Sequence, residues 1–498
     1  MAHPLLFEIN ARHWVSELSR AHGKPIDLAS IPDRELDALA AIGITHLWLM
    51  GVWPTGPRSK AEALRHPDLR NAYSEAVPDW KESDVLGSPY AIAQLHVSPL
   101  LGGDSALASL RSRLAHREIR LLLDFIPNHL GLDHPWVQSD PLLFVGSHAP
   151  FPDSFPVSLP NRTRFLAHGK DPYFPGWTDT VQLDYRRAQT RRAMTELLRA
   201  ISKKCDGVRC DMAMLVLSEV FEKTWAHVPC EDPCGEAGEF WREAIASIKK
   251  EEPHFLFLAE AYWGLEGRLC ELGFDYAYDK HLYDLLLHDR PWEVQPHLLR
   301  MGPENQRRAH FLENHDEPRV ANALGIAKHR AAAALILGLP GMRFLHDGQL
   351  QGLHRFARVQ LARRATEPAN SAVEELYGKL LPAFAKSGVG KGEALLLTPV
   401  RAWDYNPTAQ CICTVLWQDP QNEDHFELLV VNLAPHRAQC RVVLPLPPAE
   451  TSPNSSTWLL SDRLGHERWQ RDSHELTTAG LFLDVEPHAA QLFSCTRL

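Results

Sequence analysis

The chain has 498 residues, of which 45% are hydrophobic and 23% charged, and this ordinary globular composition allows one large domain plus one or two smaller ones. Its formal net charge of −10 argues against nucleic acids and anionic membranes as partners, because both favour basic protein surfaces. A neutral, hydroxyl-rich ligand is compatible with this charge, although the charge does not select one.

Short apolar runs typical of buried strands recur along the first three quarters of the chain, and amphipathic segments separate them. Eight strand–helix repeats predict the α/β class and a closed parallel (β/α)8 TIM barrel. An open doubly wound sheet is the alternative, but it usually carries a Gly-rich phosphate turn after its first strand, which is missing here. The predicted strands cover residues 5–9, 44–50, 119–125, 207–211, 255–260, 274–279, 310–315 and 342–346.

Two of the amphipathic segments show clear helical spacing. One is expected to begin after Asp104 as its N-cap, with Leu107, Leu110 and Leu114 on one face. Another has apolar residues at the same spacing over 194–201 and leads directly into the fourth predicted strand.

Two regions depart from the repeat. The segment 131–190 follows the third strand, is aromatic and rich in Pro, Asp and Asn, and predicts a small irregular subdomain inserted at the barrel mouth. The segment 389–498 contains strand-like runs between turn residues and predicts a C-terminal antiparallel β-sandwich domain. The barrel itself is then assigned to 1–130 and 191–388. The C-terminal strands are expected at 411–417, 426–431, 441–446 and 481–485.

The sequence also bears on location. Its first 14 residues show no basic stretch followed by a long apolar one, so no secretory signal is predicted. The best apolar run, 331–341, is too short to span a membrane. Nine cysteines, an odd number, favour a reducing compartment over a disulfide framework. We therefore expect a cytoplasmic protein that does not bind membranes, and the oligomeric state stays open.

Polar side chains gather where four of the predicted strands end. A lone carboxylate after an apolar run is usually a helix cap or an ion-pair partner. Four strands that deliver acids, His or Arg to one rim are different, because active sites of such barrels lie at the carboxyl ends of the strands. The residues are Asp124, Asn128 and His129 after the third strand, Arg209 and Asp211 after the fourth, Glu260 after the fifth, and His315 and Asp316 after the seventh.

Two of these carboxyls suit the cleavage of a glycosidic bond, which needs one ionised and one protonated carboxyl group across the anomeric carbon. Arg209 and Asp211 are two residues apart on a strand, so their side chains share a face. The guanidinium is expected to lower the pKa of Asp211 and keep it ionised. Glu260, from the neighbouring strand, can donate a proton to the leaving oxygen. Direct attack by Asp211 requires a separation of roughly 5–5.5 Å between the two carboxyls.

The other polar residues can bind the sugar. His129 and His315 can donate hydrogen bonds to hydroxyl groups, and Asp316 can accept them. Such bonds can strengthen as the ring flattens towards the oxocarbenium-like state.

Four segments in this order resemble the short conserved segments of the α-amylase family of glycoside hydrolases. The resemblance implies a retaining enzyme with Asp211 as nucleophile, Glu260 as acid/base and Asp316 as the third carboxylate, which holds the sugar next to the cleaved bond. It also implies the family's plan of a barrel, an excursion after strand 3 and a C-terminal β-domain. The segments are DFIPNH (124–129), GVRCDMAM (207–214), FLAEAYW (257–263) and FLENHD (311–316).

The same resemblance implies the substrate-binding residues. Arg209, His129 and His315 match family residues around that sugar. SPYAI (88–92) is similar to the segment whose Tyr stacks beneath the sugar, which would be Tyr90.

The sequence departs from the family in places. Many amylases have a Lys-His pair three and four residues after the nucleophile, for the leaving-group side and a calcium site. Here Met214 and Leu215 stand there, and neither can bind a hard cation. Asn128 matches a frequent calcium ligand, but it also suits a local hydrogen-bonding role. Gln94 replaces a frequent Asp near Tyr90. We expect no required cofactor or metal, with structural calcium as an open alternative.

The resulting expectation is an enzyme that hydrolyses α-1,4-glucosidic bonds in malto-oligosaccharides or related α-glucosides through a covalent glycosyl-enzyme intermediate. The alternative is a transglycosidase: a glucanotransferase, a maltosyl transferase or a trehalose-forming isomerase. Both begin with attack by Asp211 and differ in the acceptor. A non-catalytic sugar-binding relative is a third possibility, which the loss of Asp211, Glu260 or Asp316 would have favoured; all three are present.

Overall fold

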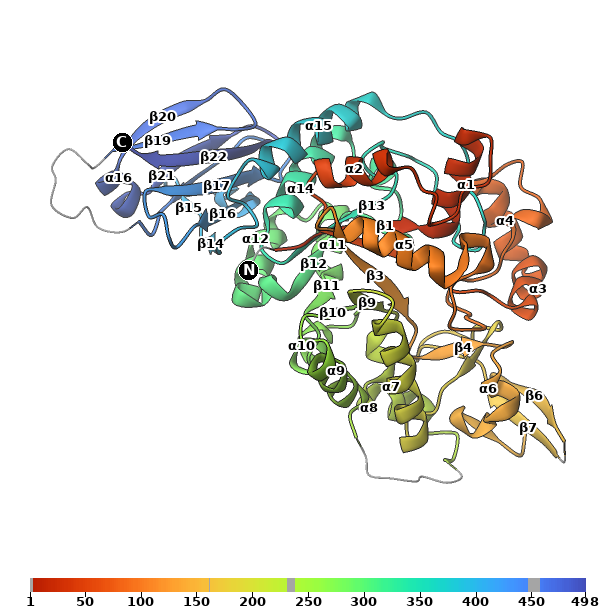
Figure 1. Ribbon diagram of the computed structural model, residues 1–498. Helices are drawn as coiled ribbons and strands as arrows, with labels where there is room; N and C mark the ends of the chain where they lie inside the picture. Colours follow the sequence, from red (N-terminus) through yellow and green to blue (C-terminus); the bar gives the residue numbers. More distant parts are fainter. Residues whose placement is uncertain (1–2, 161, 231–237, 447–456) are drawn as a thin grey trace.

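The computed structural model describes residues 3–160, 162–230, 238–446 and 457–498, and its centre is a closed parallel barrel (Figure 1). Each strand pairs with its neighbours in chain order, and the last strand pairs with the first. The strands are β1 (Leu5–Asn10), β2 (His46–Met50), β3 (Arg120–Phe125), β9 (Gly207–Cys210), β10 (Leu256–Ala259), β11 (Tyr276–Tyr278), β12 (Arg308–His310) and β13 (Met342–His346).

Both faces of the barrel strands are buried. Alternate residues such as Leu6, Leu122 and Phe344 point inwards and form a core of their own inside the barrel. Their neighbours, such as Phe7 and Leu123, point outwards into a second, larger core beneath the helices. Strands buried on both faces appear in the sequence as almost continuous apolar runs, which is why these runs predicted the barrel.

Helices surround the barrel and follow its strands. The predicted helical periodicity over 194–201 is confirmed by α7. The outer helices are α1 (Ala11–His22), α2 (Asp33–Ala41), α5 (Gly103–Ala115), α7 (Ala188–Ser202), α8 (Ser218–Trp225), α9 (Phe240–Glu251), α10 (Glu266–Glu271), α11 (Lys280–Leu287), α12 (Pro291–Met301), α13 (Val320–Ala323), α14 (Ile326–Gly338) and α15 (Ser371–Ala385).

Two local predictions are wrong. Asp104 is not the N-cap of α5, because that helix already begins at Gly103; its Oδ1 instead accepts from the backbone N–H of Val97 at 2.8 Å. The seventh strand, β12, ends at His310 rather than continuing to residue 315. Residues 311–319 form a loop whose own hydrogen bonds position the site residues described below.

Two long connections rise above the carboxyl ends of the strands. The predicted insertion after strand 3 contains the short strands β4 (His129–Gly131), β5 (Gly146–Ser147), β6 (Ser154–Leu159), β7 (Arg162–Ala167) and β8 (Thr180–Gln182), with helix α6 (Trp136–Ser139). A second excursion, between β2 and β3, was not predicted. It carries α3 (Pro57–Arg65) and α4 (Pro67–Ala76), both beginning with a proline that suits the first turn of a helix.

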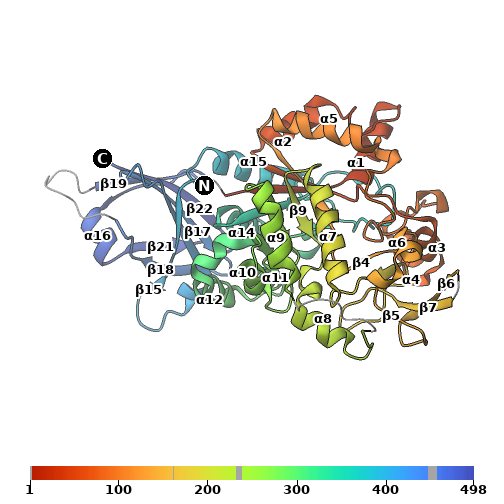
Figure 2. The same ribbon diagram turned by 60° about the horizontal axis from the view of Figure 1, so that its bottom comes forward.

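The C-terminal domain consists of two antiparallel sheets. One sheet has the strand order β14-β16-β17-β22-β19-β20 and the other the order β15-β18-β21. In both views of the molecule this domain and the insertion lie at opposite ends (Figures 1 and 2). The strands are β14 (Glu393–Leu397), β15 (Val400–Arg401), β16 (Ile412–Gln418), β17 (His425–Asn432), β18 (Ala438–Val442), β19 (Thr457–Asp462), β20 (Arg468–Asp472), β21 (Leu481–Val485) and β22 (Ala490–Arg497), with helix α16 (Ser473–Thr478).

The larger sheet packs against helix α14 of the barrel. Most of α14 is buried, and the indole N–H of Trp417 donates to the carbonyl oxygen of Gly338 at 2.8 Å. A Cβ on Gly338 would lie 2.2 Å from Leu429, so the helix and the sheet touch at this point. The predicted TIM barrel with an insertion after strand 3 and a C-terminal antiparallel β-domain is confirmed.

The described residues include no helix that combines the length and the apolar character needed to cross a bilayer. The eight cysteines in these parts of the chain are free thiols. The run Cys230–Glu231–Asp232–Pro233–Cys234 that precedes α9 in the sequence lies mostly outside the described residues.

Candidate active site

A cavity of about 660 Å³, the main cavity, opens where the barrel strands end. Five of the predicted site residues line it: Tyr90, His129, Asp211, Glu260 and Asp316. The other two predicted residues, Arg209 and His315, are buried directly behind them. The structure therefore brings all seven together at one site.

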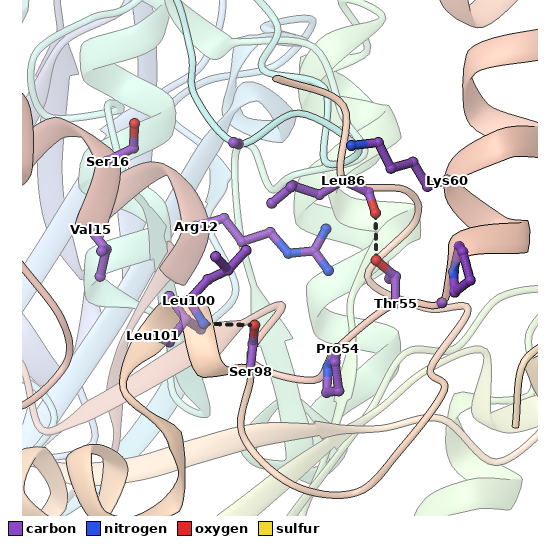
Figure 3. A pocket seen from close by; sticks show the side chains of 13 residues that line it. Arg12, Val15, Ser16, Pro54, Thr55, Lys60, Leu86, Ser98, Leu100 and Leu101 are labelled. Atoms are coloured by element: carbon purple, nitrogen blue, oxygen red, sulfur yellow. Dashed lines mark hydrogen bonds between the residues drawn. The ribbon is translucent and has the colours of Figure 1, made fainter. Parts of the chain in front are cut away.

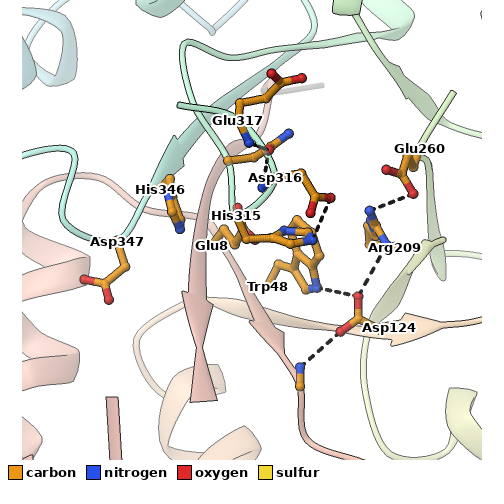
Figure 4. Close-up of polar contacts among 12 residues, drawn as sticks. Glu8, Trp48, Asp124, Arg209, Glu260, His315, Asp316, Glu317, His346 and Asp347 are labelled. Carbon is orange, nitrogen blue, oxygen red and sulfur yellow. Dashed lines mark hydrogen bonds and ion pairs between the residues drawn. The ribbon is translucent and has the colours of Figure 1, made fainter. Parts of the chain in front are cut away.

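Arg209 contacts several carboxyl groups of this site, and Figure 4 shows its contacts with Glu260 and Asp124. Its Nη1 lies 2.7 Å from Oδ1 of Asp211, and its Nη2 lies 2.8 Å from Oε2 of Glu260. The side chain is completely buried. A guanidinium is rigid and planar, so contacts to two neighbouring nitrogens fix the two carboxyl groups relative to each other.

Backbone geometry ties the two carboxyls together as well. Asp211 directly follows β9, and its N–H donates to the carbonyl oxygen of Phe125 on β3 at 2.9 Å. The next residue, Met212, has a φ of +43°, a left-handed conformation that is costly for residues other than Gly, Asn and Asp. In this conformation its N–H donates to Oε2 of Glu260 at 2.6 Å. Met212 was not predicted as a site residue.

Glu260 is suited to carry a proton near neutral pH. Burial, the largest cause, and the negative charges of Asp211 and Asp316 together raise its pKa to about 7, against the opposing effect of Arg209. The hydroxyl of Tyr262 donates to Oε1 at 2.8 Å.

The pKa of Asp211 differs from the prediction. Burial raises it above the ordinary value, and although Arg209 acts in the predicted direction, its charge does not reverse that effect. The predicted net lowering is therefore wrong, because the deep enclosure of Asp211 and the nearby charge on Asp316 arise only in the tertiary fold.

His315 connects a buried acid to the cavity. Its Nδ1 lies 2.5 Å from Oε1 of Glu8, a fully buried residue of β1. Its Nε2 lies 2.7 Å from the Tyr90 hydroxyl and 3.0 Å from Oδ2 of Asp316. Burial acts to lower the pKa of His315, but Asp316 and Glu8 together raise it well above the usual value. The ring is thus held as an imidazolium that donates from both nitrogens.

Asp316 itself faces the main cavity, with 52% of its side chain exposed. The loss of water around its carboxylate acts to raise its pKa, but the positive charge of His315 holds the pKa below the ordinary value. The loop that presents it is shaped by Asn314, whose Oδ1 accepts from the N–H groups of Asp316 and Glu317 at 2.9 and 3.0 Å. Such an Asx turn fixes the backbone locally.

The base of that loop is fixed by a buried ion pair. Glu313 is fully buried; its Oε1 lies 2.6 Å from Nη1 of Arg319 and its Oε2 accepts from the N–H of Val320 at 2.7 Å. His346, at the end of β13, lies 3.1 Å from the same carboxylate.

Asp124 closes the floor of the site. Its Oδ1 accepts from the indole N–H of Trp48 and its Oδ2 from the N–H of Gly51, both at 3.2 Å, while Arg209 lies 3.9 Å away. Burial raises its pKa to about 7. The guanidinium of Arg209 also lies over the rings of Trp48 and Tyr90, at 5.0 and 5.4 Å from their centres. Glu8 and Trp48 were not predicted, and both lie inside apolar strands without a local signal of function.

The remaining predicted residues, Tyr90 and His129, both line the main cavity. The ring of Tyr90 is stacked on His315 with 5.5 Å between centres. Burial lowers the pKa of His129 to about 3, so this ring is neutral, with one N–H to donate. Its centre lies 5.1 Å from that of Trp177, which also lines the main cavity.

Exposed aromatic side chains lie on the insertion and on the segment after β10. Trp263 is 43% exposed, and its ring contacts Tyr173 of the insertion at 5.2 Å between centres. Phe174, next in the chain, is exposed and lines the main cavity. Trp136, by contrast, packs against His134 and the core. Residues of α3 and α4, including Glu62 and Leu69, complete one wall.

The residues at the family's calcium position do not fit a cation. Oδ1 of Asn128 already accepts a hydrogen bond from Nε2 of Gln182 at 3.0 Å. Met214 and Leu215 are buried in the apolar core. A hard cation requires several oxygen ligands, and the Met214 and Leu215 side chains supply none.

No protein-family model matches the chain. The protein named α-amylase 3 of Dictyoglomus thermophilum is 21% identical over 347 residues. The alignment covers 66% of this chain and 60% of that relative, so the chain spans less than two thirds of the relative's length.

Solved structures share the whole fold. A maltogenic α-amylase from Thermotoga neapolitana superimposes with a TM-score of 0.66 at 18% identity, covering 99% of this chain and 98% of the other. A cyclic α-maltosyl-(1→6)-maltose hydrolase from Arthrobacter globiformis gives a TM-score of 0.64 at 14% identity, with coverage of 100% and 98%. The four ordered motifs resemble those of the α-amylase family of glycoside hydrolases, and the solved structures show that this chain shares the fold of such enzymes.

Proposed function

We propose that the protein is a retaining glycosidase that hydrolyses α-1,4-glucosidic bonds in malto-oligosaccharides or related α-glucosides. The observation that carries this proposal is the position of Arg209, which contacts Asp211 through one Nη and Glu260 through the other. Retaining cleavage needs two close carboxyl groups with different protonation, and this arrangement favours both conditions.

In the proposed first step, a carboxylate oxygen of Asp211 attacks the anomeric carbon. The glycosidic C–O bond breaks as Glu260 gives its proton to the leaving oxygen, and the sugar becomes an ester of Asp211. Glu260 is suited to this role because its pKa of about 7 leaves it substantially protonated near neutral pH. Once Glu260 is protonated, Asp211 has one negative neighbour fewer, which favours its ionised form beside Arg209.

In the second step, Glu260 takes a proton from a water molecule, whose oxygen attacks the same carbon and releases Asp211. Asp316 and His315 would bind the hydroxyl groups of this sugar, and Tyr90 and His129 would contact its ring and edge. The chemistry uses the chain's own carboxyls, and we propose that it needs no cofactor.

The substrate class is supported by the main cavity and by the relatives. The cavity combines hydroxyl-binding carboxyls with aromatic rings, as a sugar chain requires. The names of the relatives refer to α-amylase, maltogenic α-amylase and a maltosyl-maltose hydrolase, which share α-linked glucose and differ in the bond that is cleaved.

The test is product analysis with maltose, maltoheptaose and trehalose, with and without an added acceptor sugar. Glucose and maltose as the products would support hydrolysis, whereas longer or rearranged products would show a transglycosidase. Asp211→Asn should abolish every product, because an amide cannot form the glycosyl ester. Turnover of this variant at the wild-type rate, or inertness of the wild type towards all substrates, would overturn the proposal.

A further inference from the structure

A second cavity, of about 390 Å³, is shown in Figure 3. It is enclosed by the start of α1, the connection from β2 to α3, and the segment that precedes α5. The two cavities share the segment 86–90 as a wall, since Leu86 lines the second cavity while Ser88 and Tyr90 line the main one. Its volume is within the range of small-molecule sites in proteins.

The lining of the second cavity is positively charged. It contains Arg12 and Lys60 but no Asp or Glu, although the whole chain carries a net charge of −10. Figure 3 shows the Arg12 guanidinium in the middle of the cavity and the amine of Lys60 directed towards the same space. Lys60 takes part in no ion pair within the described parts of the chain.

Arg12 is a buried cation that forms no ion pair with any residue that the structure describes. Its residue is 8% exposed. Its Nη1 donates to the carbonyl oxygen of Gly87 at 2.9 Å and its Nη2 lies 3.4 Å from that of Trp53. Burial lowers its pKa to about 10, and the opposing contribution comes from Tyr90 rather than from a carboxylate. A buried charge is normally paired, so a missing anionic partner indicates a ligand.

The remaining walls set the shape of that ligand. Most of them are apolar, and Leu100 at the rim is 68% exposed, unusual for a large apolar side chain. Three hydroxyl groups add polar contacts at the edges. The apolar walls are Val15, Leu86, Leu100 and Leu101, and the hydroxyls belong to Ser16, Thr55 and Ser98.

We propose that the second cavity binds a small organic anion, a phosphate or carboxylate on a compact apolar body, with its acid group between Arg12 and Lys60. A guanidinium fork recognises either acid group through paired hydrogen bonds, and the ammonium adds a second charge. The apolar body would cover the leucine side chains.

Binding at this place would act on the main cavity through the shared wall. Arg12 holds Gly87, whose φ of +91° turns the chain three residues before Tyr90. A Cβ on Gly87 would lie 3.1 Å from the backbone nitrogen of Lys60, so the turn packs directly on α3. An anion that binds the Arg12 guanidinium would compete with the carbonyl oxygen of Gly87 for its N–H groups, and would therefore shift the segment that carries Tyr90. The binding itself does not depend on the proposed glycosidase activity.

The test is isothermal titration of the full chain with phenyl phosphate and with benzoate, and with benzyl alcohol as the neutral counterpart. We expect saturable binding with one site per chain for at least one of the two anions and none for the alcohol, and weaker binding as ionic strength rises. The two anions separate phosphate from carboxylate as the preferred group. Inorganic phosphate alone measures the contribution of the apolar body.

Lys60→Met tests whether the anion binds in the second cavity, because it removes the positive charge and keeps a long side chain. Lys60 is partly exposed, so we expect the variant to fold. We expect at least about a tenfold loss of affinity, with no change in Lys24→Met, an exposed lysine elsewhere. Leu100→Asp, at the exposed rim, should also weaken binding by repulsion. Equal affinity for anion and alcohol, or unchanged affinity in Lys60→Met, would overturn the proposal whether or not the enzyme hydrolyses glucosides.

Discussion

The carboxylate of Glu8 lies 2.5 Å from Nδ1 of His315, on the side of the ring that faces away from Asp316. The two residues are 307 positions apart in the chain, yet the closure of the barrel places them in contact. Glu8 touches no part of the main cavity, so it acts through His315: it holds the second proton on the ring, and the charged ring holds Asp316 ionised.

Glu8→Gln should therefore lower kcat/KM for malto-oligosaccharides by about tenfold or more, since it replaces a charge-assisted hydrogen bond by a neutral one of the same shape. The raised pKa of His315 keeps the imidazolium at neutral pH, and loss of Glu8 lowers that pKa. The pKa of His315, followed by NMR of its ring, should consequently be lower in the variant than in the wild type. The same titration of Glu252→Gln, an exposed control, should match the wild type; an unchanged His315 pKa in Glu8→Gln would reduce Glu8 to a packing role.

Glu260→Gln separates the two carboxyl roles. On maltoheptaose we expect a loss of about 10²–10⁴-fold, the usual contribution of a general acid. On α-glucosyl fluoride, whose leaving group needs no proton, formation of the Asp211 ester should be far less affected. In the wild type, kcat/KM on maltoheptaose should fall as pH rises through about 7, because Glu260 donates only while protonated. Equal losses on both substrates would argue against the acid role.

Met212 offers a test of backbone strain. Its φ of +43° is tolerated by Asn but is unfavourable for a β-branched residue. Met212→Val should destabilise the protein by roughly 1–2 kcal/mol relative to Met212→Asn, which shortens the side chain comparably. It should also lower kcat more, because the Met212 N–H would no longer be aimed at Glu260. The free energy of unfolding in denaturant and kcat are compared between the two variants. Equal stability of the two would refute the strain argument.

Removal of metal ions should leave this protein unchanged. Oδ1 of Asn128 is occupied by the amide of Gln182, and Met214 and Leu215 supply no oxygen ligand. We expect the midpoint of thermal unfolding and the rate on maltoheptaose to be the same after dialysis against EDTA as after addition of calcium. A higher midpoint with calcium would show a site that the described side chains do not reveal.

The barrel and most of the site could be predicted because their signals are local. Runs buried on both faces predicted the strands, and Arg209 and Asp211 lie two residues apart, so strand geometry alone places them on one face. His315 and Asp316 lie at the predicted rim although the seventh strand ends at His310 rather than at residue 315. A longer strand and a shorter strand followed by a loop both place these two residues at the carboxyl end of the barrel.

What could not be predicted depends on contacts between distant segments. Glu8 and Arg12 lie in or next to an apolar strand, and nothing near them in sequence points to His315 or to a second cavity. The pKa of Asp211 depends on the enclosure created by the whole rim. Helices α3 and α4 were missed because their apolar residues are few, and their place over the main cavity follows from the tertiary fold.

The contact between Trp417 and Gly338 has a consequence for synthesis of the chain. Helix α14 is apolar nearly all round, and its outer side is covered by strands that begin about 75 residues later, with Leu429 and Trp417 in one core with the barrel. During translation the eighth barrel strand is therefore made long before its neighbouring helix can be shielded from water. The apolar outer face of α14 therefore stays exposed until the C-terminal sheet has been synthesised. If a ribosome stalls between residues 346 and 412, this face is available to bind chaperones or to aggregate with other nascent chains.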